Sequence, residues 1–574
     1  MNNMEKFDRI EEEHYDDPED FDEVSQRHLN HHNVSLMRPS VSSNESEILG
    51  NSHQKHERDR FNNYLEYVLT VLGFAAGFGS LWRFPYLVYK NGGGAFLIPY
   101  CILLVVIGIP AFYLETCLGQ LYQKGPPKIF ESFGKRFKGI GYMAILIAFN
   151  ECTYYNLILG YSMYYLWKSF QFPLPWSVDQ TSENEVPWNT SYFYDDVLKS
   201  TDSINELGGM VWPLFLCYCL SQLVVFLCIQ KGVAVSGRIA LFTATSPYIL
   251  LFLLMIRGFF LDGAWDGIAF LLTPDLNKLT ELTVWSDAAA QVIFQFSAGI
   301  GILVFFGSYR DKRQEVQKTS IQVPLLTCLC GFLSAFAVFS FMGYMAKQSN
   351  LTISELPLAG PDLTFIAYPA VITMMPFQNF WAVIFYLVMI FLGIDTQFGF
   401  IDGLAGTIED DHLTHRGIKI GNRYFSSRVC RFFINVTVML TGFLYCSQGG
   451  FYFLEFVDSY TTSVPSLLSI GFEVVFFTHY NDWVTLEKKI IRYIKTPTPK
   501  IYIIFLKYVI PVVTFGLAAS ALYNQILKIG DQSFLITLFG WVITSYPIGT
   551  AFYYYFKYKD IEEQEEIKNQ LLKD

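Results

Sequence analysis

Charged residues are scarce in this chain of 574 residues: they make up 16% of it, whereas 52% is hydrophobic and 17% is aromatic. Several stretches lack charge altogether, and each is longer than the roughly 20 residues that a helix needs to cross a bilayer. These uncharged stretches are 92–114, 208–230, 288–309 and 321–346. The composition excludes a set of soluble domains and predicts an all-α polytopic membrane protein.

Other features are missing as well. The sequence before the first apolar segment does not predict a cleavable signal peptide. The long loop 171–207 has no cysteine, and the ten cysteines lie in or beside apolar segments, which predicts core residues and not a disulfide framework. No phosphate loop or nucleophile–base arrangement stands out, so an enzyme is not predicted. The sequence predicts neither a nucleic-acid partner nor an oligomeric state.

The apolar segments predict twelve transmembrane helices, near 62–87, 93–123, 138–168, 208–230, 238–260, 286–309, 320–346, 378–406, 427–447, 450–478, 503–525 and 533–556. The loops after every second span are rich in Lys and Arg, and the opposite loops are acidic, so both termini are predicted to be cytosolic. Residues 1–60 are predicted to be a disordered tail and 557–574 a second cytosolic tail. The sequons at Asn189 and Asn350 fall outside and predict glycosylation.

Two apolar segments contain nearly the same glycine motif. The first copy is Ala75-Ala76-Gly77-Phe78-Gly79 and the second is Ser297-Ala298-Gly299-Ile300-Gly301. Paired glycines disfavour continuous helix, and non-helical backbone at membrane depth survives only where it lines a cavity or is buried. Two interrupted helices in corresponding positions point to a transporter binding site, although close helix packing alone also favours such spacing.

The residues around these motifs carry a family resemblance. The stretch Gly79-Ser80-Leu81-Trp82-Arg83-Phe84-Pro85 and the later Gly393-Ile394-Asp395-Thr396 closely resemble the neurotransmitter:sodium symporter family. The similarity covers about 58–556 and implies two inverted five-helix repeats, about 61–260 and 284–479, within a transporter domain 61–556. The first and sixth helices would be unwound, and two extra helices would span about 502–556.

The resemblance also implies ion sites. A sodium ion would be bound by Gly73, Ala76, Leu392, Asp395 and Thr396. A hard cation needs such oxygen ligands, and Asp395 stands in an otherwise uncharged run. A second sodium site, at Ala75, Ser80, Gln295 and Thr327, departs from the family pattern at its last three positions. Tyr100 and Gln291 match chloride ligands, but Gln295 and Gly331 replace two hydroxyl donors, so weak or no chloride dependence is predicted.

The substrate site follows by the same resemblance. It would contain Gly77, Phe78, Gly79, Glu151, Tyr155, Phe294, Ser297, Ile300, Thr396 and Phe400. Gly77 leaves room for a substrate carboxylate, which the amides of Phe78 and Gly79 would receive. Glu151 stands where the family has an apolar residue, and three interpretations remain: binding a cationic side chain, charge or proton coupling, and a protonated structural acid.

The same resemblance implies gates, formed by Arg83 with Asp458 outside and by Arg58, Tyr309 and Asp410 inside. Together these residues predict a plasma-membrane symporter that imports amino acids with sodium. The alternative is a family member that does not transport and acts as a nutrient sensor or trafficking partner.

Overall fold

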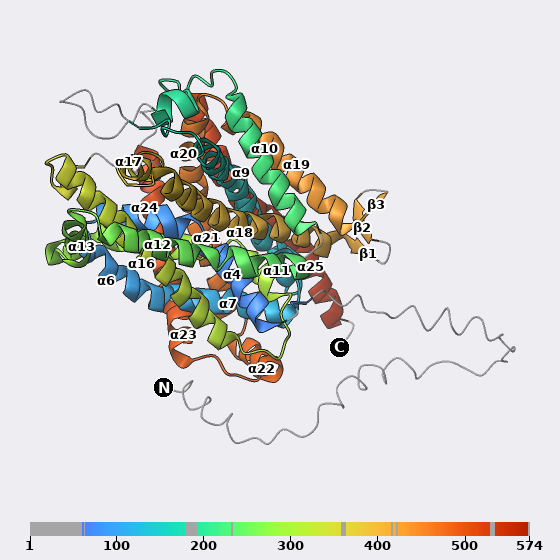
Figure 1. Ribbon diagram of the computed structural model, residues 1–574. Coiled ribbons are helices and arrows are strands. Elements are labelled where there is room, and N and C mark those ends of the chain that lie inside the picture. Colours follow the sequence, from blue (N-terminus) through green and yellow to red (C-terminus); the bar gives the residue numbers. More distant parts are fainter. Residues whose placement is uncertain are drawn as a thin grey trace. The chain divides into compact units, whose positions relative to one another are not determined.

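The computed structural model describes residues 60–61, 63–177, 192–230, 233–356, 363–414, 417–420, 423–527 and 534–571, all within the unit Arg58–Asp574 (Figure 1). The helices of the first half are α4 (Tyr64–Ala75), α5 (Phe84–Lys90), α6 (Gly94–Leu103), α7 (Ile109–Tyr122), α8 (Pro126–Glu131), α9 (Lys138–Lys168), α10 (Trp212–Ile229), α11 (Val233–Thr243), α12 (Ser246–Phe259) and α13 (Ala264–Leu272). Those of the second half are α14 (Leu282–Gln295), α15 (Ile302–Gly307), α16 (Val316–Gln348), α17 (Tyr368–Thr373), α18 (Gln378–His412), α19 (Ser427–Tyr445), α20 (Gly450–Thr462), α21 (Val464–Val475), α22 (Trp483–Ile494), α23 (Lys500–Ile504), α24 (Ile510–Leu527) and α25 (Phe534–Leu571). Short 3₁₀ or π-helical turns lie at Gly79–Arg83, Leu104–Gly108, Lys135–Phe137, Tyr192–Leu198, Leu276–Thr280, Ile353–Glu355, Leu363–Ala367, Phe476–Tyr480 and Phe505–Val509.

The length and composition of the helices are those of a membrane protein. Within the described residues, nine continuous helices are long and apolar enough to cross a bilayer, and the bent pair Tyr64–Ala75 and Gly79–Lys90 raises the number to ten. The helix α9 and the short pair α14 and α15 are not among them. The prediction of twelve spans therefore stays a prediction, whereas the polytopic class is confirmed.

The outward face of α10 shows why the protein needs a bilayer. Leu216, Leu220, Leu223 and Leu227 follow one another at helical spacing, and each is more than half exposed. Such a continuous apolar stripe would be costly in water but is stable against lipid. The three helices α9, α10 and α19 lie side by side, so that α10 and α19 cover α9 (Figure 1).

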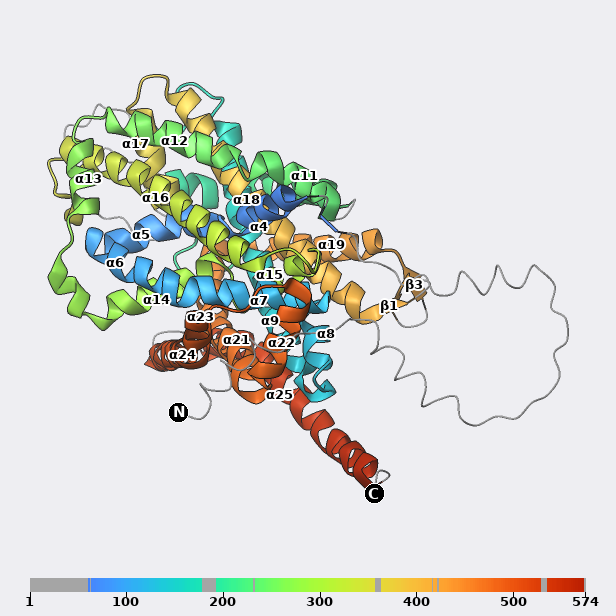
Figure 2. The same cartoon turned by 90° about the horizontal axis from the view of Figure 1, so that it is seen from below.

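The core of the bundle lies around α18. Of the residues in its most apolar stretch, 89% are buried, compared with 22% for the span Lys500–Leu527. The helix α18 packs against α9, α12, α19 and α4. In another part of the bundle, α21 packs against α24 and α25 (Figure 2). Side chains of α18 are therefore held on a rigid central element.

Two interruptions occur at the glycine motifs. The first lies between α4 and the turn beginning at Gly79, where the two parts are bent by 55°. The second separates α14 from α15, and there Gly299 and Gly301 have φ values of 85° and 76°. Only glycine adopts these left-handed values without strain. At Gly77 the requirement is different, because an added Cβ would collide with Tyr155 and Thr396.

The all-α prediction needs one small correction. The strands β1 (Leu413–Thr414), β2 (Gly417–Ile420) and β3 (Arg423–Phe425) form an antiparallel sheet in the order β1-β2-β3, after the end of α18. Ile418 pairs with both Leu413 and Phe425. The sheet is a short three-stranded meander that directly follows the span Gln378–His412.

All ten cysteines are free, as predicted. They are not uniformly core residues, since Cys101 is exposed and Cys217, Cys219 and Cys228 are half-buried.

Candidate substrate and ion site

The first interruption is held against α18 and α9 by hydroxyl groups. The Thr396 hydroxyl donates to the Phe74 carbonyl at 3.0 Å, and the Phe78 amide donates to the Tyr155 hydroxyl at 3.1 Å. An added Cβ at Gly77 would meet both hydroxyl oxygens. Four predicted site residues, Gly77, Phe78, Tyr155 and Thr396, therefore share contacts around a backbone that has left the helix.

Aromatic rings enclose this backbone. Phe78 and Tyr155 stack with centroids 4.7 Å apart, and Phe400 meets Tyr155 edge-on at 5.8 Å. A Cβ at Gly79 would lie 3.1 Å from the ring of Phe294, so the second interrupted helix closes another side. The arrangement gives an apolar enclosure with a few polar groups, which is typical of a small-molecule site.

The second interruption is held by neighbouring helices. The Gly299 amide donates to Oε1 of Glu115 in α7 at 2.6 Å, and the Gly299 carbonyl accepts from the Ser469 hydroxyl in α21 at 2.6 Å. Beside it, Ile300 is buried and Ser297 is half-buried with a φ of 48°. The structure places these two predicted substrate residues in the loop itself.

Asp395 is the chemical centre of the predicted sodium site. Its side chain is 4% exposed, and Oδ1 accepts a hydrogen bond from the Thr243 hydroxyl at 2.5 Å. Within the described residues, Oδ2 has no hydrogen-bond partner, and it lies where a Cβ at Gly73 would collide with it. A buried, unpartnered carboxylate oxygen beside interrupted backbone is a suitable ligand for a hard cation.

The other predicted sodium residues belong to α18 and to the end of α4. Thr396 also donates to the Leu392 carbonyl at 3.3 Å, and Ala76 is the C-cap residue directly after α4. Searched over the described residues, no group of three or more His, Cys, Asp or Glu side chains could hold a metal. Any cation here would therefore depend on carbonyl and hydroxyl oxygens in addition to one carboxylate.

Gln295 connects the residues of the predicted second sodium and chloride sites. Its Oε1 accepts from the Tyr100 hydroxyl at 2.7 Å, and its Nε2 donates to the Ser80 hydroxyl at 2.8 Å and the Thr327 carbonyl at 3.3 Å. Gln291 donates to the Gly79 carbonyl at 2.9 Å. The Gln295 amide thus hydrogen-bonds to three residues named for the predicted ion sites, and Ala75, the fourth residue of the predicted second sodium site, is buried in α4.

The predicted outer gate contains one more acid than the pattern suggested. Arg83 interacts electrostatically with Asp458, and its guanidinium carbon lies 4.2 Å from the centroid of the Phe294 ring. Glu151, 6% exposed, interacts with both Arg83 and Asp458. Two carboxyl groups therefore lie within electrostatic range of one guanidinium, which itself lies over the Phe294 ring.

The predicted inner gate is only partly covered, because Arg58 lies outside the described residues. Tyr309 is buried, and its carbonyl accepts from the Phe61 amide at 3.3 Å. Oδ2 of Asp410 accepts from the Gly125 amide at 2.5 Å, which joins the end of α18 to the loop before α8.

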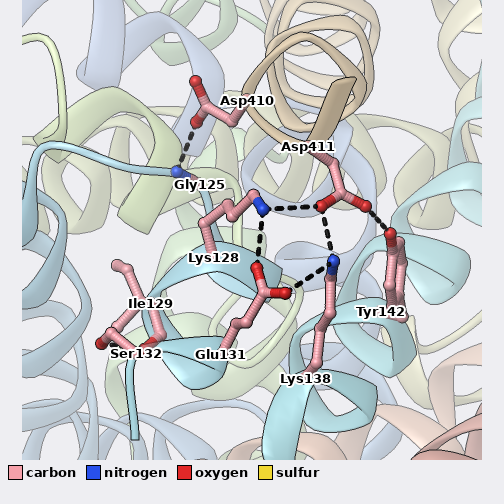
Figure 3. A network of polar contacts seen from close by, with 9 residues as sticks. All are labelled: Gly125, Lys128, Ile129, Glu131, Ser132, Lys138, Tyr142, Asp410 and Asp411. Carbon is pink, nitrogen blue, oxygen red and sulfur yellow. Dashed lines mark hydrogen bonds and ion pairs between the residues drawn. The ribbon is translucent and has the colours of Figure 1, made fainter. Parts of the chain in front are cut away.

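A network next to Asp410 was not predicted from the sequence. Nζ of Lys138 lies 2.5 Å from Oδ1 of Asp411 and 3.3 Å from Glu131, and Nζ of Lys128 lies 2.7 Å from Glu131 and 3.2 Å from Asp411 (Figure 3). The Tyr142 hydroxyl donates to the second oxygen of Asp411 (Figure 3). These contacts join α8 and α9 to the end of α18. A hollow of about 400 Å³ beside them is lined by Lys124, Lys128, Glu131, Ser132 and Asp410.

One predicted glycosylation site can be located. Asn350 is exposed, with a φ of 52°, in the turn after α16. Asn189 lies outside the described residues, as does the N-terminal tail.

An apolar helical bundle with two helices interrupted at corresponding glycine motifs has the architecture expected of a membrane transporter. The family model described as "Sodium:neurotransmitter symporter family" matches residues 58–544, and the chain belongs to this family. Members of this family are transporters and not enzymes, so the prediction of a sodium-coupled transporter of the neurotransmitter and amino-acid type is confirmed at this level.

Individual relatives are similar over most of the chain. The "Sodium- and chloride-dependent GABA transporter 2" of Mus musculus is 37% identical over 435 residues, covering 72% of this chain and 71% of the relative. The protein of the same name from Homo sapiens is also 37% identical over 435 residues, with the same coverage. The "Sodium- and chloride-dependent taurine transporter" of Bos taurus is 36% identical over 446 residues, covering 72% and 70%. The names of these relatives include chloride, so the expectation of weak chloride dependence is not borne out.

Proposed function

We propose that this chain imports amino acids together with sodium by alternating access, through twelve spans in two inverted five-helix repeats. The repeats would cover about 61–260 and 284–479, the two remaining helices about 502–556, and both termini would be cytosolic, in the plasma membrane. The two interruptions support this reading because each falls in the first helix of its repeat. The residues 1–60 and 557–574 would be the cytosolic tails.

The unpartnered oxygen of Asp395 is the observation that carries the sodium proposal. A carboxylate at this depth costs about 2.5–3.5 kcal/mol unless it is compensated, and a bound cation offsets that cost. Gly73, Ala76, Leu392 and Thr396 would supply the remaining oxygens. One sodium ion moving with a zwitterion across ~100 mV and down a tenfold gradient provides about 2.3 plus 1.4 kcal/mol, enough for several-hundredfold accumulation.

The substrate proposal depends on the charges near the enclosure. The substrate carboxylate would take the place of the Tyr155 hydroxyl at the Phe78 amide, and Gly77 would leave room for it. Glu151 and Asp458 both lie near Arg83, so an ionised Glu151 would add a negative charge that Arg83 does not balance. We therefore propose that the transporter prefers amino acids with a cationic side chain, whose second amine lies several bonds from the acid group. GABA and taurine, named for the relatives, also separate an amine from an acid group and are included as candidates.

The contacts of Gln295 bear on the number of sodium ions that move with each substrate. Because its amide already joins Ser80, Tyr100 and Thr327, we propose that this chain couples one sodium ion to each substrate. Because the names of the relatives include chloride, we propose that this chain also uses chloride, and that Tyr100 and Gln291 would contact it.

Uptake of radiolabelled substrates into proteoliposomes tests the proposal. Lys, Leu, GABA and taurine are compared with sodium or choline outside, and with chloride or gluconate. We expect uptake to depend on sodium and to be fastest for the substrates whose amine lies several bonds from the acid group, namely Lys, GABA and taurine. Asp395→Asn serves as the matched negative control, since it keeps the shape of the side chain and removes the charge. Uptake that is equal in sodium and choline would contradict the proposal.

The second candidate function is a family member that senses nutrients or assists trafficking without transport. The Gln295 amide favours it, because it closes part of the ion region with internal hydrogen bonds. Substrate-dependent thermal stabilisation with no uptake of any substrate would identify this function.

A further inference from the structure

The helix α22 is held at the edge of the membrane by its connections. It lies between the spans Gly450–Tyr480 and Lys500–Leu527, and only Asn481 and Asp482 separate it from the first of them. Two residues extend over at most ~7 Å, so the start of α22 cannot move far from the bilayer. The helix lies at the same end of the bundle as the start of α23 (Figure 1).

The rotation of α22 about its axis is fixed by a buried face. Trp483, Leu486, Ile490 and Ile494 are each at most 3% exposed, and the helix packs on α7. The only acid within the helix, Glu487, also points inward, where it accepts hydrogen bonds from the amide and the hydroxyl of Thr498 at 2.7 and 2.6 Å. The one carboxyl group within the helix therefore does not lie on its exposed face.

The opposite face of α22 combines basic and apolar side chains. Val484, Lys488, Ile491 and Lys495 follow one another at helical spacing, and all four are exposed. Lys489, Arg492 and Tyr493 lie next to them and are exposed too. Within the part of the chain that the structure describes, none of these four cations forms an ion pair. Val484 and Ile491 remain 38% and 39% exposed among them.

We propose that this exposed face of α22 binds the anionic headgroups of membrane phospholipids. A short helix that is basic outside, with apolar side chains between the charges, matches an interfacial helix, and each Lys or Arg near an anionic surface contributes about 1 kcal/mol. The aliphatic stems of the lysines and the side chains of Val484 and Ile491 would reach the acyl boundary while the ammonium groups stay among the phosphates.

The side of the membrane follows from the proposed function, since cytosolic termini would place α22 at the cytosolic leaflet, where anionic lipids concentrate. Lipid binding itself does not require transport. The acidic residues of the N-terminal tail offer a competing occupant of opposite charge, and the experiment separates it from lipid.

Native mass spectrometry of the purified full-length protein, titrated with phosphatidylserine or phosphatidylcholine, tests the proposal. The variant Lys488→Gln/Lys489→Gln/Arg492→Gln/Lys495→Gln removes four charges from exposed positions. The control Lys488→Arg/Lys489→Arg/Lys495→Arg keeps every charge. A second variant, Val484→Ser/Ile491→Ser, removes the apolar component, and a further chain lacks residues 1–57. Thermal unfolding in detergent checks that each variant is folded.

We expect the Gln variant to bind phosphatidylserine about tenfold more weakly or worse, with phosphatidylcholine binding unchanged and with the Arg control equal to wild type. The effect should shrink as ionic strength rises, because salt screens exposed charges. Equal phosphatidylserine binding by wild type and the Gln variant would overturn the proposal. Binding that appears only after removal of residues 1–57 would overturn it too, in favour of the acidic tail. Since the measurement involves no transport, a failure of the proposed function leaves this outcome unaffected.

Discussion

The Thr243 hydroxyl donates to Oδ1 of Asp395 at 2.5 Å, while Oδ2 of the same carboxylate is buried without a hydrogen-bond partner among the described residues. One oxygen is thus fixed by α11, and the other is available on the side of Gly73. The hydrogen bond orients the carboxylate and stabilises its charged form.

We expect Asp395→Asn to abolish sodium-driven uptake and Thr243→Val to raise the sodium concentration for half-maximal uptake by about tenfold, since a hydrogen bond to a charged group contributes about 1.5–3 kcal/mol. Thr243→Ser keeps the hydroxyl and should behave as wild type. Initial uptake rates across a sodium series measure this. An unchanged sodium dependence in Thr243→Val would show that the hydrogen bond does not position the ligand.

Gln295→Ser shortens the side chain and frees the Tyr100 hydroxyl and Ser80 from their amide partners. We expect the dependence of uptake on sodium to become steeper than in wild type, because a second cation can then approach Ser80 and Thr327. The number of charges moved per substrate, measured by electrical recording with labelled uptake, should rise from one towards two. A wild-type protein that already couples two sodium ions would refute this.

Glu151→Gln keeps the size of the side chain and removes one of the two carboxyl charges near Arg83. We expect uptake of Lys to fall at least about tenfold while uptake of Leu changes little, since buried charge pairs are far stronger than those in water. Glu151→Val should shift the preference further towards Leu. If both variants instead lose every substrate, or change their sodium dependence, the coupling interpretation is correct. Unchanged selectivity would leave Glu151 as a structural acid.

Glu131 should make the inner network sensitive to acid. Burial alone would raise its pKa, but the hydrogen bond from Lys128 and the charges of Lys138 and Lys128 outweigh burial, so the pKa lies below its ordinary value of 4.5. Its stabilising effect is therefore present above pH 4.5 and is lost as the pH falls through the lowered pKa. We expect Glu131→Gln to lower stability at neutral pH by less than about 1 kcal/mol, because the group is partly solvated. Thermal unfolding at neutral and acidic pH should show the difference between the two proteins disappearing in acid.

Arg431 forms a buried ion pair with Asp402, with Nε 2.8 Å from Oδ1, and its Nη1 lies 3.4 Å from Glu409. We expect Arg431→Met to destabilise the protein by about 3–5 kcal/mol, because it leaves buried carboxylates uncompensated. The double variant Arg431→Met/Asp402→Asn should recover part of that loss. Thermal unfolding of both variants in the same detergent decides whether charge or packing is responsible.

The helices could be predicted because lipid imposes strong rules on sequence. Long uncharged runs become helices when every backbone group must be paired within the segment, and glycine motifs mark where that pairing stops. The two interruptions at Gly77 and Gly299 follow from these rules. Even so, the reason for Gly77 proved to be crowding by Thr396 and Tyr155 and not backbone φ.

The contacts that complete the site could not be predicted. Thr243 and Asp395 are 152 positions apart, and nothing in the local sequence of α11 indicates that its hydroxyl faces α18. The network of Asp411, Lys138 and Tyr142 similarly joins residues that are far apart, and such pairs depend on the tertiary packing of α8, α9 and α18. The meander β1–β3 was missed because its strands are only two to four residues long.

The peptide groups around Gly299 have a mechanical consequence. Its amide is bound by Glu115 of α7 and its carbonyl by Ser469 of α21, while α15 packs along α7. If α15 tilts relative to α14, it must either carry α7 and α21 along or give up these two hydrogen bonds, each of which contributes about 0.5–1.5 kcal/mol. The loop between α14 and α15 therefore behaves as an anchored pivot, and the pieces that swing about it are whole groups of helices.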